Sequence, residues 1–155
     1  MRNKVGSVIG RVEKCGGRNV FPWLKRSCIY IAVLSGDTDT LWYYRDKLCD
    51  FAERNHDKIE VVLTTSKGAL LQSIRPFNRK PDFIIVAAPL NLYQYQMFIE
   101  QLEGRRSRAK VFFMGTGEVL KGYEKKVISV ANKAKLEWYL EREMDWLQRK
   151  RLWRW

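Results

Sequence analysis

From residue 28 onward, short apolar runs alternate with stretches in which apolar residues recur at helical spacing, and this alternation restricts the fold more than any other feature. The runs are continuously apolar rather than apolar at every second position, which is typical of strands buried on both faces. Five of them are predicted to be strands: residues 28–36, 58–66, 81–89, 109–117 and 126–131. Such an alternation predicts a parallel sheet covered by helices on both sides.

The segments between these runs have one apolar face each. In residues 37–55, for example, Leu41, Tyr44 and Leu48 are spaced as on one side of a helix. The predicted helices are residues 37–55, 67–74, 90–104 and 132–155. Five strands in a chain of this rhythm predict an α/β flavodoxin-like fold, a doubly wound five-stranded parallel sheet with strand order 2-1-3-4-5.

Residues 1–27 do not follow this pattern. They contain two short apolar runs around Gly16 and Gly17, which suits either a hairpin or a basic arm that packs partly on the body. We therefore divide the chain into an N-terminal basic extension, residues 1–27, and an α/β domain, residues 28–155, that ends in a long helix.

The positive charge is concentrated at the two ends. The chain has a net charge of +12, of which +6 lies in residues 1–27 and +4 in residues 149–155. Basic ends of this kind suit contact with an acidic partner, although they also keep a protein in solution. No apolar run approaches the roughly 20 residues of a membrane span, so we expect no span and a cytoplasmic location.

Few residues here suit catalysis or metal binding. The three cysteines have no metal-like spacing, and we expect them to be reduced structural thiols. His56 is the single histidine, which argues against a catalytic triad or a histidine-rich metal site. We expect no cofactor.

Residues 29–140 resemble a response-regulator receiver domain, most closely the variety that precedes LytTR-type DNA-binding domains. The resemblance rests on "YIAVLSGDTDT" for the opening, "PDFIIVAAP" for the central strand and "KVFFMGTG" for the fourth strand. It implies phosphoryl transfer at the carboxyl ends of the strands. The family uses two acids that hold Mg²⁺, a nucleophilic aspartate, a Ser or Thr, and a lysine.

The nucleophile position falls on Ala87. No Asp or Glu occurs between residues 84 and 95, and Asp82 lies at the opposite end of the predicted strand. Because a strand rises about 3.3 Å per residue, Asp82 would be on the order of 15 Å from the required position. The sequence thus predicts a pseudo-receiver that lacks the phosphoacceptor and is not an enzyme.

The other family positions are also altered. They fall on small or apolar residues: Ser35 and Gly36 for the acids, Gly115 for the Ser or Thr, and Val130 or Ala131 for the lysine. Slips of one to three residues would bring in side chains of the right type: Asp37, Thr116 and Lys133. Asp37 and Asp39 are weak candidates for a metal site, and helix capping is the simpler role for both.

The C-terminal helix carries the strongest sign of a binding surface. Its end mixes cations with indoles, as in protein interfaces, where Trp and Arg are often hot spots. The candidate partner-binding residues are Trp138, Trp146, Arg149, Lys150, Arg151, Trp153, Arg154 and Trp155. A second basic cluster, residues 104–110, is expected to be a solvated loop.

These features lead to a regulatory interaction module that binds another protein or a second copy of itself. Two alternatives stay open. The basic ends suit nucleic-acid binding, with phosphate pairing and base stacking. The loop at residues 34–40 opens a helix and suits a small phosphate ligand, although its two acids oppose one.

Overall fold

The computed structural model describes residues 11–15, 28–55, 58–74, 80–88, 90–115 and 121–152, with backbone only at 11–15, 73 and 148–152. The strands are β1 (Arg11–Cys15), β2 (Ile29–Leu34), β3 (Ile59–Thr64), β4 (Phe83–Val86), β5 (Lys110–Met114) and β6 (Val127–Val130). The helices are α1 (Thr38–Asn55), α2 (Lys67–Ser73), α3 (Leu92–Gly104), the short 3-10 helix η1 (Lys133–Lys135) and α4 (Leu136–Leu152).

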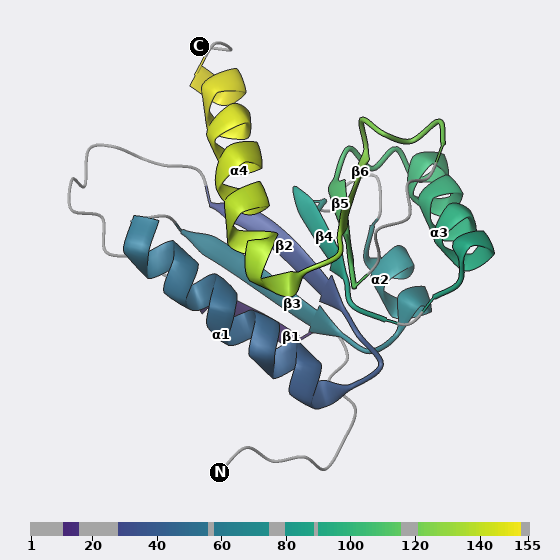
Figure 1. Ribbon diagram of the computed structural model, residues 1–155, viewed down its shortest axis with the longest axis horizontal. Helices are drawn as coiled ribbons and strands as arrows, with labels where there is room; N and C mark the ends of the chain where they lie inside the picture. Colours follow the sequence, from purple (N-terminus) through teal and green to yellow (C-terminus); the bar gives the residue numbers. More distant parts are fainter. Residues whose placement is uncertain are drawn as a thin grey trace.

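The sheet has the order β1-β3-β2-β4-β5-β6. The five strands β2 to β6 are parallel to their neighbours, which gives the order 2-1-3-4-5 and confirms the predicted flavodoxin-like arrangement. Helices α1 and α4 lie on one face of the sheet, and α2 and α3 lie on the other (Figure 1). All five parallel strands therefore end at one edge of the sheet and begin at the other.

The N-terminal extension contributes a sixth strand to the sheet, whereas the sequence suggested a hairpin or a basic arm and no pairing with the sheet. β1 pairs antiparallel with β3, from Arg11 opposite Leu63 to Cys15 opposite Ile59. It covers the outer backbone edge of β3, which would otherwise present unpaired N–H and C=O groups. The described part of residues 1–27 thus belongs to the sheet. The rest of the expected arm or hairpin lies outside the described residues.

Two apolar cores explain why the strands read as continuous apolar runs. Alternate residues of β2 point to opposite faces: Ile31 and Val33 pack with α1 and α4, whereas Ala32 and Leu34 pack with α2 and α3. Each of these four side chains is buried. Because both faces of the sheet are covered, no strand residue in the centre needs a polar side chain.

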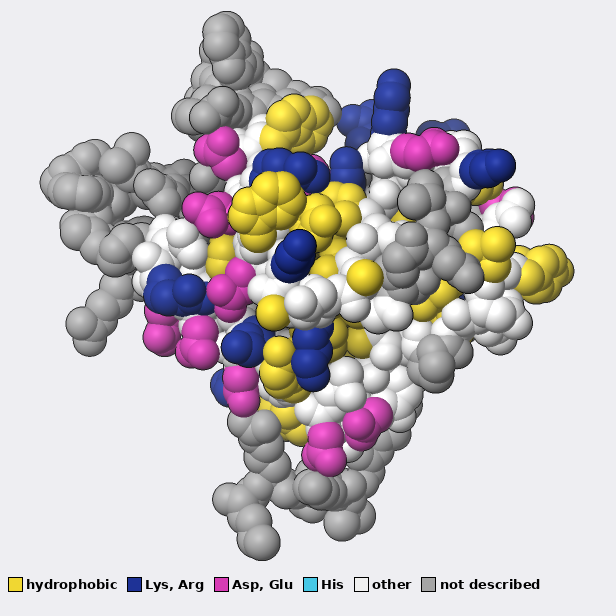
Figure 2. Space-filling model, in the orientation of Figure 1, with side chains coloured by type: hydrophobic (Ala, Val, Ile, Leu, Met, Phe, Trp, Pro, Cys, Tyr) yellow, Lys and Arg dark blue, Asp and Glu magenta, His cyan; other side chains and the backbone are white. Residues whose placement is uncertain are grey.

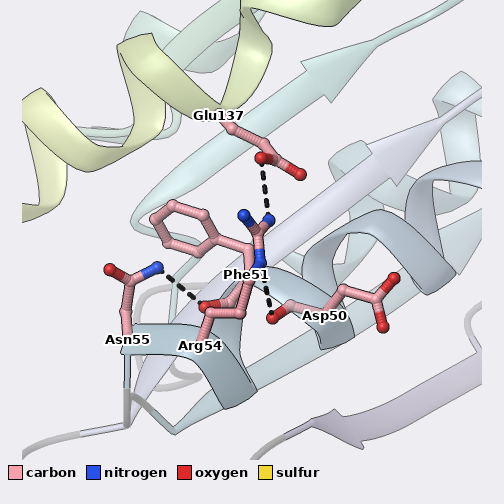
Figure 3. Close-up of polar contacts among 5 residues, drawn as sticks. All are labelled: Asp50, Phe51, Arg54, Asn55 and Glu137. Carbon is pink, nitrogen blue, oxygen red and sulfur yellow. Dashed lines mark hydrogen bonds and ion pairs between the residues drawn. The ribbon is translucent and has the colours of Figure 1, made fainter.

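The C-terminal helix begins at Leu136, four residues later than predicted, because Asn132 caps η1 with its side chain instead. Leu136, Leu140 and Met144 bury the inner face of α4. At its start, Glu137 accepts from Arg54 of α1, with 2.8 Å between the guanidinium nitrogen and the carboxylate oxygen (Figure 3). Glu137 raises the pKa of Arg54 through this hydrogen bond.

The cysteines are not all reduced. Cys49 of α1 is disulfide-bonded, whereas Cys28 is a free thiol. The expectation of reduced thiols was therefore wrong for Cys49, because the spacing of cysteines along a sequence does not report which thiols meet in the fold.

None of the helices in the described part of the chain is long and apolar enough to cross a membrane.

Candidate functional site

The first candidate lies where the parallel strands end. A pocket of about 450 Å³ opens there, which we call the carboxyl-edge pocket. It is lined by Thr40, Tyr44, Ala87, Met114, Gly115, Ala131, Asn132 and Lys133. The receiver-like positions at residues 87, 115 and 131 therefore do meet in space, as their places at the strand ends predicted. None of the described residues that line this pocket carries a carboxylate.

The acids of the following loop are used in helix capping or stand at the surface. The Asp37 carboxylate accepts from the backbone N–H of Asp39 at 3.1 Å and from the Thr40 hydroxyl at 2.9 Å. These bonds satisfy groups at the start of α1, which is the capping role expected for Asp37. Asp39 lies exposed in the first helical turn. Within the described ranges, no group of three or more His, Cys, Asp or Glu residues is placed to hold a metal ion.

Lys133, which a small shift in the alignment would place at the lysine position of the receiver family, contacts an aromatic ring instead. Lys133 lines the carboxyl-edge pocket, but its Nζ lies 4.6 Å from the centre of the Tyr43 ring, a cation–π distance. Gly115, which also lines this pocket, has a φ of +82°. This conformation favours glycine over the Ser or Thr of the receiver family. Thr116 lies outside the described residues.

The hydroxyl of Tyr44 cannot act as a base in this pocket. Burial, together with the neighbouring Tyr43, raises the pKa of Tyr44 to about 12. Tyr44 is therefore neutral at physiological pH. Among the described residues of its lining, the carboxyl-edge pocket then has one positive charge, on Lys133, and no negative charge.

The second candidate lies at the opposite edge, where the parallel strands begin. A larger pocket of about 780 Å³, the amino-edge pocket, opens there against the outer half of α4. It is lined by Lys80, Pro81, Asp82, Phe83, Arg106, Arg108, Lys110, Lys125, Arg142, Glu143, Trp146 and Leu147. Figure 2 shows Lys and Arg side chains gathered at the upper part of the molecule, beside exposed hydrophobic side chains over α4.

This pocket is strongly basic. The described residues of its lining include six cations and two carboxylates, a surplus of four positive charges. Both carboxylates have partners: Asp82 accepts from the backbone N–H of Tyr30 at 3.0 Å, and Glu143 lies 3.7 Å from the Nζ of Lys110 and 3.8 Å from the guanidinium of Arg142. The position of Asp82 at this edge agrees with the prediction that it lies far from Ala87.

Arg106 is held in an unusual backbone conformation. Its φ is +57°, the left-handed region that side chains other than glycine rarely adopt. It ends α3 in a Schellman motif, in which the Ser107 N–H donates to Leu102 O at 3.0 Å and the Arg106 N–H donates to Glu103 O at 2.9 Å. Glycine is the usual residue at this position, so an arginine here is energetically unfavourable for the fold.

The two described tryptophans of α4 have different surroundings. Trp146 is 59% exposed and lines the amino-edge pocket. Trp138 is 57% exposed and packs edge-on against Tyr139, with the guanidinium carbon of Arg142 4.9 Å from the centre of its ring. Arg142 therefore connects the aromatic pair to the pocket.

The other predicted partner-binding residues are at the end of α4 and beyond it. Of Arg149, Lys150 and Arg151 only the backbone in α4 is described, and residues 153–155 lie outside the described part of the chain. The sequence missed the contribution of Lys80 and Lys125. It also assigned the cluster at 104–110 to a solvated loop, whereas three of its cations line the pocket.

In comparisons with protein-family models, with curated proteins and with solved structures, nothing matches this chain.

Proposed function

We propose that this chain is a non-catalytic, receiver-like regulatory domain that acts by binding a partner, and that it operates in the cytoplasm. The observation that carries the proposal is the lining of the carboxyl-edge pocket, which has the position of a receiver site but, among the residues that the structure describes, contains no carboxylate. The strand order 2-1-3-4-5 supports the receiver-like part of the proposal.

The chemistry of phosphoryl transfer explains why this observation matters. The methyl group of Ala87 has no lone pair with which to attack phosphorus. A receiver also needs acids to hold the Mg²⁺ that neutralises charge on the phosphoryl group. Here Asp37 is engaged at the start of α1, and Lys133 lies over Tyr43.

Incubation with acetyl phosphate and Mg²⁺, followed by intact-mass spectrometry, tests whether the chain accepts a phosphoryl group. We expect no added phosphoryl group, while an ordinary receiver domain treated in parallel gains one. A phosphoryl adduct on this chain would overturn the proposal.

Another protein, including a second copy of the chain, is the partner that the sequence favours. The cluster of Trp138, Tyr139 and Arg142 favours it, because exposed Trp and Arg side chains are enriched in interface hot spots. Light scattering over a concentration series tests self-association. A dimer that Trp138→Ala converts to a monomer would support this candidate, and a strict monomer at all concentrations would count against self-association.

A further inference from the structure

We propose that the amino-edge pocket binds single-stranded nucleic acid, with phosphates on its cations and a base on Trp146. This inference rests on the proposed binding function and names its partner.

The cations of this pocket converge from separate parts of the chain. Lys80 precedes β4, Arg106 and Arg108 follow α3, Lys110 begins β5, Lys125 precedes β6, and Arg142 comes from α4. A solvated charged face would place its cations along one helix, pointing into water. Here the fold brings like charges together around one hollow, where Lys80 Nζ donates to Arg106 O at 3.4 Å and Lys110 Nζ donates to Lys125 O at 2.7 Å. An anion would reduce the repulsion that remains between these charges.

The two carboxylates of the lining do not cancel the surplus of positive charge in the amino-edge pocket. Asp82 is bonded to the backbone of Tyr30, so its charge is partly used in holding β2 against the start of β4. Glu143 lies between Lys110 and Arg142, and it offsets the charge of at most one of them. The remaining charge matches a ligand that carries several negative groups, such as successive phosphates.

The backbone conformation of Arg106 also supports an anion-binding site. A left-handed residue at a helix end is favourable for glycine and unfavourable for arginine. Residues held in such conformations are often found where function requires their side chain. The side chain that is kept here at the expense of stability is a cation that lines the pocket.

The indole of Trp146 favours single-stranded nucleic acid over other anions as the ligand. Its indole is 59% exposed while it lines the pocket, so more than half of the side chain faces solvent beside the cations. Every base has a ring face that stacks on an aromatic side chain, and stacking next to a basic groove is the usual mode of single-strand binding. A duplex keeps its bases stacked inside, and an acidic peptide offers carboxylates without a ring. The pocket, at about 780 Å³, is also larger than a lone phosphate requires.

Fluorescence anisotropy with a labelled DNA or RNA strand of about 16 nucleotides tests the inference on the full chain. If up to four phosphates are neutralised, the salt slope is about −2.8, so raising the salt fourfold weakens binding roughly 50-fold. Trp146→Ala should weaken binding about tenfold through lost stacking. Arg106→Gly should also weaken binding, while its melting temperature stays unchanged or rises. This combination separates loss of a ligand contact from loss of the fold.

Lys133→Ala is the matched control, because it removes one positive charge at the opposite edge of the sheet. Its affinity should stay within about twofold of the parent.

Three outcomes would overturn the inference. Binding that Arg106→Gly and Trp146→Ala leave unchanged would place the nucleic acid on the basic ends instead. Equal competition by polyglutamate would identify an acidic protein as the ligand, and tighter binding of a duplex would exclude a single strand. Each of these leaves the proposed lack of phosphoryl chemistry intact, since that proposal is tested by the mass measurement alone.

Discussion

The two edges of the same sheet differ in nearly every property that matters for function. The carboxyl-edge pocket lies where this fold class ordinarily binds its ligands, yet its described lining presents apolar or uncharged polar side chains and one cation. The amino-edge pocket lies where strands begin, and it gathers six cations with an exposed tryptophan. The same sheet thus has a pocket at the usual ligand-binding edge, while the positive charge gathers around the pocket at the other edge.

This difference teaches that the position of a site and its chemistry are separable. The shape of the carboxyl-edge pocket follows from backbone topology, because parallel strands that end together leave a hollow between the following loops. Its chemistry depends on a few side chains, and at residue 87 the side chain is the methyl group of an alanine. The amino-edge pocket arose from loops that the topology leaves free to vary.

The largest effect that would sharpen this comparison is expected from reversing charge at the amino edge. Arg108→Glu combined with Lys125→Glu should weaken binding of single-stranded nucleic acid at least about 100-fold, or roughly 2.8 kcal/mol. Both side chains are exposed, so the fold should be retained. Anisotropy titrations at fixed salt measure the effect, with Lys133→Glu as the control at the other edge.

The comparison would break if the control lost as much affinity as the double variant. That result would mean that binding follows net charge alone, and that neither edge is a specific site.

A smaller effect is expected at the carboxyl edge in alkaline solution. Because the pKa of Tyr44 is raised to about 12, the folded state keeps a phenolic proton that the unfolded state loses near pH 10. The stability that this tyrosine contributes is thus complete below about pH 10 and is lost as the pH rises toward 12. The loss should amount to about 2 kcal/mol.

Urea titrations measure this loss of stability in the parent and in Tyr44→Phe. They run between about pH 9 and pH 12, a range that includes the ordinary pKa of the phenol. Phenylalanine has no proton to lose, so its free energy of unfolding should fall less steeply with pH. Parallel slopes for the two proteins would show that Tyr44 titrates normally.

Arg106→Gly is expected to change stability and binding in opposite directions. Relief of the left-handed conformation should raise the free energy of unfolding by up to about 1 kcal/mol, since glycine has no Cβ to clash but gains entropy when unfolded. Thermal and urea unfolding measure the gain. Arg105→Gly, at the preceding residue with a negative φ, is the matched control and should not stabilise the fold.

The smallest effect is expected for Lys133→Ala. Its contact with Tyr43 is exposed, so the loss should be about 0.5 kcal/mol or less. Urea unfolding measures it. A loss of several kcal/mol would mean that Lys133 holds the carboxyl edge together, and the view of that pocket as chemically idle would need revision.

Much of the fold could be predicted because it depends on patterns local to each segment. The helical spacing of Leu41, Tyr44 and Leu48 predicted the buried face of α1, and all three side chains are buried. The continuous apolar runs predicted strands covered on both faces. Topology then followed from the rules that govern parallel strands and their crossovers.

The pairing of the N-terminal strand with the sheet escaped prediction for a physical reason. Residues 11–15 contain arginine, glutamate and lysine among their apolar neighbours, so they carry no pattern of a buried strand. Their place in the sheet depends on backbone bonds to β3, which any sequence can form. The disulfide at Cys49 was missed likewise, since it depends on a distance between parts of the chain.

By itself, the sequence determined the buried faces of the elements, the order of the parallel strands and the absence of a carboxylate at residue 87, because each follows from the type and spacing of neighbouring residues. Only the tertiary structure decided that Lys80, Arg108, Lys125 and Trp146 surround one pocket. These residues are far apart in the chain, and they meet because parallel strands bring all their amino ends to one edge of the sheet, where the Coulomb interactions of separate loops first act together.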